Sequence, residues 1–147
     1  MAVKDITPQQ AHDTLSADPA SVYIDVRSPQ EFANGHPAGA VNIPVAFADP
    51  ARGMVVNPDF LGVIEKNFAK DKKIIVGCQA GPRSTRAAGM LVDAGYQDIT
   101  NLLGGFGGMR DQSGRVLAPG WQASGLPVSR DVGDGTSYAS LAAKAKD

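Results

Sequence analysis

The chain has 147 residues, 43% of them hydrophobic and 20% charged, and its formal net charge is −1. A chain of this length can bury a normal core in one domain without metal or disulfide crosslinks. The balanced charge gives no reason to expect nucleic acid or an anionic membrane as a partner, and no segment approaches about 20 consecutive apolar residues. We therefore expect a soluble globular domain that binds neither.

The cysteine content limits the compartment and the chemistry. Cys78 is the only cysteine, so an internal disulfide is excluded and a reducing compartment is the simpler interpretation. One cysteine and two histidines make a poor structural zinc site. The first residues lack the apolar stretch and the cleavage pattern of a secretory signal. We expect a cytoplasmic protein without a metal, or an organellar one if a transit peptide has been removed.

Capping signals and apolar periodicity predict the helices. Thr7 and Ser28 each precede a proline and have Gln or Glu three residues on, which is the pattern of a capping box. Asn57 also precedes a proline and is predicted to cap a helix over residues 58–69. A further helix with one apolar face is predicted over residues 84–94.

Short apolar runs between these helices predict strands. The runs rich in β-branched and aromatic residues are 21–26, 41–44, 72–76 and 98–103. Because strands and helices alternate, we expect an α/β domain over residues 1–128, with a central mostly parallel sheet and helices on both faces. Residues 49–58 and 107–120 are predicted to be long loops. Residues 129–147 lack a strong apolar pattern and are predicted to form a flexible tail with at most a short helix.

Cys78 lies between the third predicted strand and a helix expected to open at Ser84. Ligands of parallel α/β sheets bind at the carboxyl ends of the strands, where such loops lie. Gly81 allows the loop to curl and to aim several backbone N–H groups inward. The helix N-terminus and the cationic side chains of Arg83 and Arg86 would then favour the thiolate form of the cysteine.

Two interpretations of Cys78 follow from these neighbours. Free cysteine is among the most buried residue types, so Cys78 can be a small hydrophobic filler at the end of a strand. A filler does not need a loop of glycine, proline and arginine before the next helix. The loop therefore favours a reactive nucleophile.

The loop sequence "CQAGPRS", residues 78–84, resembles the active-site loop of the rhodanese-like sulfurtransferases. The segment "YIDVRSPQEFANGHPAGAVNIP", residues 23–44, resembles a second signature of that family. The segments "NLLGGFGGMR" and "GWQASGLPV" resemble its Gly-Gly turn and its closing segment. The motifs stand in the family's order and cover about residues 6–128. The resemblance implies a rhodanese-like fold of the single-domain type.

The resemblance also implies an activity. Cys78 would take a sulfane sulfur from a small sulfur-containing anion such as thiosulfate and pass it, as a persulfide, to cyanide or a thiol, including a protein thiol. No cofactor is required. The remaining loop residues would surround the donor: Gln79, Ala80, Gly81, Pro82, Arg83 and Ser84. A low-turnover persulfide carrier or sensor that acts on a protein partner is the alternative.

The length of the loop argues against a third activity. The same fold carries cell-cycle phosphatases whose loop is one residue longer, Cys-x5-Arg, because phosphate is larger than a sulfur atom. Here the spacing from Cys78 to Arg83 is Cys-x4-Arg. The shorter loop disfavours a phosphatase or an arsenate reductase.

Charged residues near the loop have supporting roles under this resemblance. Arg83 is expected to contact the sulfonate of the donor or to tie the loop down through a carboxylate. Asp25 is expected to be a structural partner of the loop or of Arg83, and Arg27 a residue of the site's rim; plain turn chemistry, with Asp25 accepting backbone N–H groups, is the alternative. Arg86 would add positive charge near the rim.

Three further residues modify the expectation. The position after the cysteine is often basic in the resembling family, and Gln79 makes the rim less positive here. Pro82 has no backbone N–H, so the loop has one donor fewer for the sulfur. His36 belongs to a Gly/Pro turn and is expected to be structural, because a thiolate needs no base.

Overall fold

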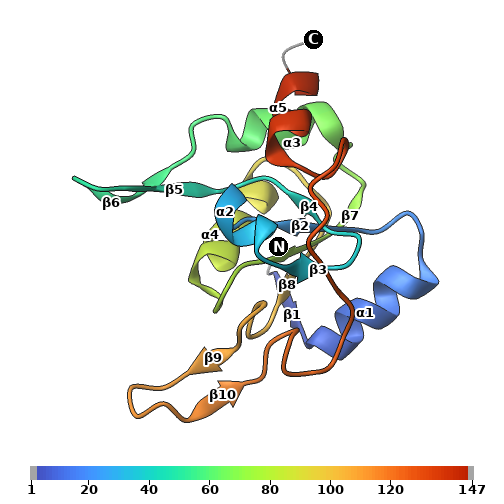
Figure 1. Cartoon of the computed structure of the whole chain (residues 1–147). Helices are drawn as coiled ribbons and strands as arrows, with labels where there is room; N and C mark the ends of the chain where they lie inside the picture. Colours follow the sequence, from blue (N-terminus) through green and yellow to red (C-terminus); the bar gives the residue numbers. More distant parts are fainter. Residues whose placement is uncertain (1–2, 146–147) are drawn as a thin grey trace.

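The computed structural model describes residues 3–145, and at its centre is a five-stranded sheet. Every neighbouring pair of strands is parallel, as predicted (Figure 1). In spatial order the strands are β1 (Lys4–Ile6), β8 (Asp98–Leu102), β7 (Lys73–Gly77), β2 (Val22–Asp25) and β4 (Val41–Asn42). The middle strand β7 carries three fully buried residues in a row, Ile74, Ile75 and Val76. Such a continuous apolar run is typical of a strand covered on both faces.

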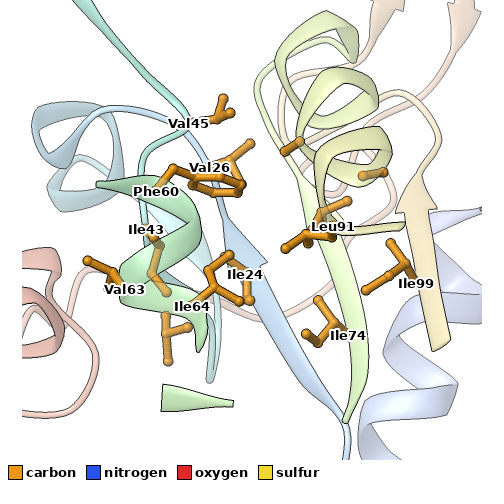
Figure 2. Packing of buried hydrophobic residues seen from close by; sticks show 14 of the residues in the cluster. Ile24, Val26, Ile43, Val45, Phe60, Val63, Ile64, Ile74, Leu91 and Ile99 are labelled. Atoms are coloured by element: carbon orange, nitrogen blue, oxygen red, sulfur yellow. The ribbon is translucent and has the colours of Figure 1, made fainter. Parts of the chain in front are cut away.

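Helices cover both faces of this sheet, which confirms the predicted fold class. The helices are α1 (Pro8–Ala17), α2 (Pro29–Ala33), α3 (Phe60–Asn67), α4 (Pro82–Asp93) and α5 (Tyr138–Ala145). Successive residues of a strand point to opposite faces. Ile24 and Ile74 accordingly pack with α3, α4 and α5, and Figure 2 shows them beside Ile64 and Leu91. Tyr23 packs on the other face in a cluster that includes buried side chains of α1 and α2.

The helix starts follow the capping signals in part. Thr7 and Ser28 form the predicted capping boxes of α1 and α2. The start predicted after Asn57 is wrong, because α3 begins at Phe60. The side chain of Asn57 is used in a turn: its Oδ1 accepts from the Asp59 N–H at 3.0 Å, and its Nδ2 donates to the Pro44 carbonyl at 2.9 Å.

Two segments predicted to be loops are antiparallel hairpins. Within residues 46–56, β5 (Ala46–Asp49) pairs with β6 (Gly53–Val56), and within residues 109–118, β9 (Met109–Arg110) pairs with β10 (Val116–Ala118). Both hairpins extend from the body on the same side in Figure 1. Their strands are two to four residues long, too short for a clear alternation of polar and apolar residues.

The segment after the expected domain end is packed against the body. Strand β11 (Val128–Ser129) pairs with β3 (His36–Pro37), and α5 lies against α3. Leu141 is only 5% exposed, and the Tyr138 hydroxyl accepts from Asn57 Nδ2 at 3.0 Å. The short helix allowed for in the expected tail is therefore α5, which packs against α3, while residues 146–147 of that prediction lie outside the described part.

Within residues 3–145, no helix combines the length and the apolar character needed to cross a bilayer.

Candidate active site

Cys78 occupies the predicted position, directly after the central strand β7 and before α4. Its side chain is 1% exposed. The Gly81 N–H donates to Cys78 Sγ at 3.1 Å, and the Cys78 thiol lies 3.5 Å from Ser84 Oγ. A backbone donor three residues on thus points back at the sulfur, which is the geometry of an anion-binding loop.

Helix α4 begins two residues earlier than predicted. Gly81 is its N-cap, with φ of 135°, and Pro82 is the first helical residue. The missing N–H of Pro82 costs no intrahelical bond at this position. Ser84 therefore does not open the helix; its buried hydroxyl donates to the Gly81 carbonyl at 3.0 Å. The helix N-terminus accordingly lies nearer the sulfur than the sequence suggested.

A glycine-rich loop after β8 holds the other side of the cysteine loop. The Phe106 N–H donates to the Cys78 carbonyl at 2.7 Å, and the Gly107 N–H donates to the Gln79 carbonyl at 2.8 Å. A Cβ at Gly105 would collide with the backbone of Cys78 and Gln79, and a Cβ at Gly107 would meet the side-chain amide of Gln79. Because the C=O and N–H of a trans peptide point in opposite directions, these bonds turn the next two N–H groups away from the glycine loop.

The residue before the cysteine is also restricted to glycine. A Cβ at Gly77 would collide with the hydroxyl end of Tyr23. Tyr23 of β2 is buried. This burial is the largest cause, and the nearby charge of Asp25 the second, that raises the pKa of its hydroxyl well above the ordinary value. The sequence pattern did not indicate this contact between Tyr23 and Gly77.

Arg83 pairs with a carboxylate that the sequence did not identify as its partner. Its Nη1 and Nη2 donate to Glu31 of α2 at 2.7 and 3.0 Å. The hydrogen bonds from Arg83 are the largest cause that lowers the pKa of the Glu31 carboxyl from 4.5 to about 2. The same bonds raise the pKa of Arg83. Of the two roles considered for Arg83, the structure shows the tie to a carboxylate, and the carboxylate is not Asp25.

Arg27 is not the rim residue that we expected, because only 3% of its side chain is exposed. It pairs with Asp25 at 2.7 Å, donates to the Gly35 carbonyl at 2.6 Å and lies 4.6 Å from the centre of the Phe106 ring. Asp25 Oδ1 also accepts the Arg27 N–H at 3.0 Å, as the turn interpretation stated. The pair reaches the cysteine loop through Gln79, whose Oε1 accepts from Arg27 Nη1 at 3.0 Å.

The remaining predicted residues lie at different distances from the chemistry. Ala80 is part of the loop, whereas Arg86 is exposed on α4 and forms no ion pair within the described residues. His36 is buried, stacks on Phe32 and contacts the Phe32 carbonyl through Nδ1 at 2.7 Å, so its position is structural. In the part of the chain that the structure describes, no three His, Cys, Asp or Glu side chains gather to hold a metal ion.

Known proteins resemble this chain over most of its length. Residues 7–112 match the family described as the rhodanese-like domain. The chain is 39% identical over 118 residues to "Thiosulfate sulfurtransferase 16, chloroplastic" of Arabidopsis thaliana, which covers 80% of this chain and 86% of that protein. It is 33% identical over 108 residues to the thiosulfate sulfurtransferase GlpE of Haemophilus influenzae, with 74% and 89% covered.

Solved structures and longer relatives complete the comparison. The crystal structure of Rv0390 from M. tuberculosis superposes with a TM-score of 0.73 at 33% identity and covers 89% of this chain and 100% of that chain. Three further plant relatives are 42% or 43% identical, but the match covers only 45% to 49% of their length. The chain belongs to the family of rhodanese-like domains, among whose members are thiosulfate sulfurtransferases.

Proposed function

We propose that the protein is a sulfurtransferase in which Cys78 carries the transferred sulfur. The observation that carries the proposal is the Gly81 N–H aimed at Cys78 Sγ at 3.1 Å, at the N-terminus of α4. A sulfur in this position is stabilised as an anion by backbone dipoles that need no rearrangement. The relatives named thiosulfate sulfurtransferase support thiosulfate as the donor.

The proposed reaction has two displacements. The Cys78 thiolate attacks the outer sulfur of thiosulfate, the S–S bond of thiosulfate breaks, and its electron pair leaves with sulfite. Cyanide or a thiolate then attacks the outer sulfur of the Cys78 persulfide, and the electron pair of that bond returns to Cys78 Sγ. Each step exchanges one S–S or S–C bond for another, so no oxidant is needed, and covalent catalysis replaces one hard transfer by two easier ones.

The surrounding residues have supporting parts in this proposal. The Gly81 N–H and the N-terminus of α4 stabilise the negatively charged sulfur at each stage. Phe106 and Gly107 fix the loop carbonyls outward, so that the loop keeps its shape when the sulfur is added or removed. Arg83 acts through Glu31 as an anchor of the loop, because both of its bonds end on that carboxylate.

A mass measurement tests the proposal. The protein is incubated with thiosulfate, and its intact mass is compared with that of Cys78→Ala. We expect the wild type to gain the mass of one sulfur atom and to lose it when cyanide is added, with release of thiocyanate. Turnover that survives in Cys78→Ala contradicts the proposal. A mass gain followed by little thiocyanate would instead assign the low-turnover carrier.

A further inference from the structure

A small pocket opens beside the cysteine loop and has no part in the reaction described so far. Its volume is about 270 Å³, and its lining includes Arg27, Gly35 and Phe106 together with the carboxamides of Asn34, Gln79 and Gln122. Two of the lining residues are connected to Cys78. Gln79 follows Cys78 in the chain, and the Phe106 N–H donates to the Cys78 carbonyl. A group held in this pocket therefore lies next to the loop that carries the sulfur.

The charges at this pocket already have partners. Arg27, which lines it, is paired with Asp25 at 2.7 Å. Glu31, which also lines it, is paired with Arg83 at 2.7 Å. Because neither charge is free, the pocket offers little net attraction to an anion such as thiosulfate or sulfite. Hydrogen bonding is therefore the main interaction that this pocket can offer.

The groups left free for hydrogen bonding are carboxamides. Arg27 is only a donor, so the bond at 3.0 Å fixes Oε1 of Gln79 toward Arg27 and turns Nε2 of Gln79 the other way. Within the described residues, neither this Nε2 nor the side chains of Asn34 and Gln122 hydrogen-bonds to another protein group. A carboxamide has donors and an acceptor, which match the N–H and C=O of a peptide group.

We propose that this pocket is a subsite for the amide groups of a peptide thiol that accepts the sulfur from Cys78. The inference rests on the proposed sulfurtransferase function and names the class of its acceptor. A volume below the range of roughly 300–1,000 Å³ of drug-sized pockets suits a short peptide segment. In the transfer, the peptide thiolate forms an S–S bond to the outer sulfur, the Cys78 Sγ–S bond breaks, and Cys78 keeps the electron pair.

Single transfers from sulfur-loaded protein test the subsite. The protein is loaded with thiosulfate, desalted and checked by intact mass, and then mixed with glutathione, 2-mercaptoethanol or cyanide. Glutathione is the peptide thiol, 2-mercaptoethanol is a thiol without amides, and cyanide has neither group. The variant is the double substitution Asn34→Leu with Gln122→Leu, at two exposed positions. The control is Gln97→Leu, an exposed amide beyond the opposite end of α4.

We expect the double variant to need about tenfold more glutathione for half-maximal transfer, because it loses the hydrogen bonds of two side chains. Transfer to 2-mercaptoethanol and to cyanide should not change, and Gln97→Leu should match the wild type with all three acceptors. An equal change for glutathione and 2-mercaptoethanol, or no change for glutathione, overturns the subsite while the sulfurtransferase stands. A protein that gains no sulfur mass from thiosulfate overturns the proposed function and the subsite with it.

Discussion

Two arginine–carboxylate pairs flank the cysteine loop, and they differ in burial. In the pair of Arg27 with Asp25, the side chains are 3% and 1% exposed. In the pair of Arg83 with Glu31, they are 23% and 35% exposed. Both pairs form two or more hydrogen bonds at similar distances, so geometry does not distinguish them. Solvent does.

The difference separates a structural pair from an anchoring pair. Breaking a buried pair leaves a charge without solvent or partner, which is costly. Breaking a partly exposed pair leaves charges that water can solvate, so the cost to stability is small. Arg27 also binds Gly35 and Gln79, and therefore joins the strand, a turn and the loop. We infer that Arg27 maintains the fold around the site and that Arg83 adjusts the loop.

The largest expected effect follows from Arg27→Met, which keeps the length of the side chain and removes its charge. Asp25 would stay buried without a partner, and we expect the free energy of unfolding to fall by about 3–5 kcal/mol. Urea denaturation measures this loss. Arg86→Met removes an exposed arginine on α4 and should change stability by no more than about 0.5 kcal/mol. If Arg27→Met is as stable as Arg86→Met, the buried pair of Arg27 with Asp25 does not have the structural role assigned to it.

A smaller effect on stability is expected for Glu31→Gln, which frees Arg83 from its carboxylate. The free energy of unfolding should fall by about 1 kcal/mol or less, because the pair is partly exposed. The effect on catalysis should be larger, with kcat/KM for thiosulfate lowered about tenfold, since a displaced loop no longer aims its donors correctly. Denaturation and thiocyanate release are measured on the same sample. A large stability loss with unchanged kcat/KM would reverse the roles assigned to the two pairs.

The smallest effect is the pH dependence of the Glu31 contribution. The pKa of Glu31 is lowered in the folded protein to about 2, from 4.5. Its stabilising contribution is therefore complete above pH 4.5 and disappears as the pH falls toward 2. The stability difference between wild type and Glu31→Gln should be constant from about pH 5 to 7 and shrink at about pH 3. A difference that grows on acidification would contradict the lowered pKa.

Local features of the site were predictable, but its long-range partners were not. The apolar run before Cys78 and the glycine after it gave the position of the cysteine between strand and helix. Pro82 is a further local signal, because proline is common at the first helical position, where α4 begins. Glu31 was recognisable only as part of a capping box. Its pairing with Arg83, 52 residues away, depends on the packing of α2 beside the loop.

The fold shows the same division. Parallel order followed from the alternation of strands and helices, which constrains topology strongly. The two hairpins could not be recognised, because strands of two to four residues carry almost no pattern. Helix α5 carries a weak sequence signal for a related reason: Leu141 is buried in the core, but most of the other residues of the helix are alanine. Tertiary contact with α3, which no local pattern encodes, fixes this helix.

The buried Trp121 and Leu141 have a consequence for where this molecule can be cut. The match to the family description ends at residue 112, whereas Trp121 is 1% exposed in the cluster on one face of the sheet and Leu141 is 5% exposed in the cluster on the other. A chain shortened to the shared stretch would open both faces to water at once. We therefore expect the folding unit to extend beyond residue 112, because α5 shares a buried cluster with Ile74 and Val76 of the strand that leads to the cysteine loop.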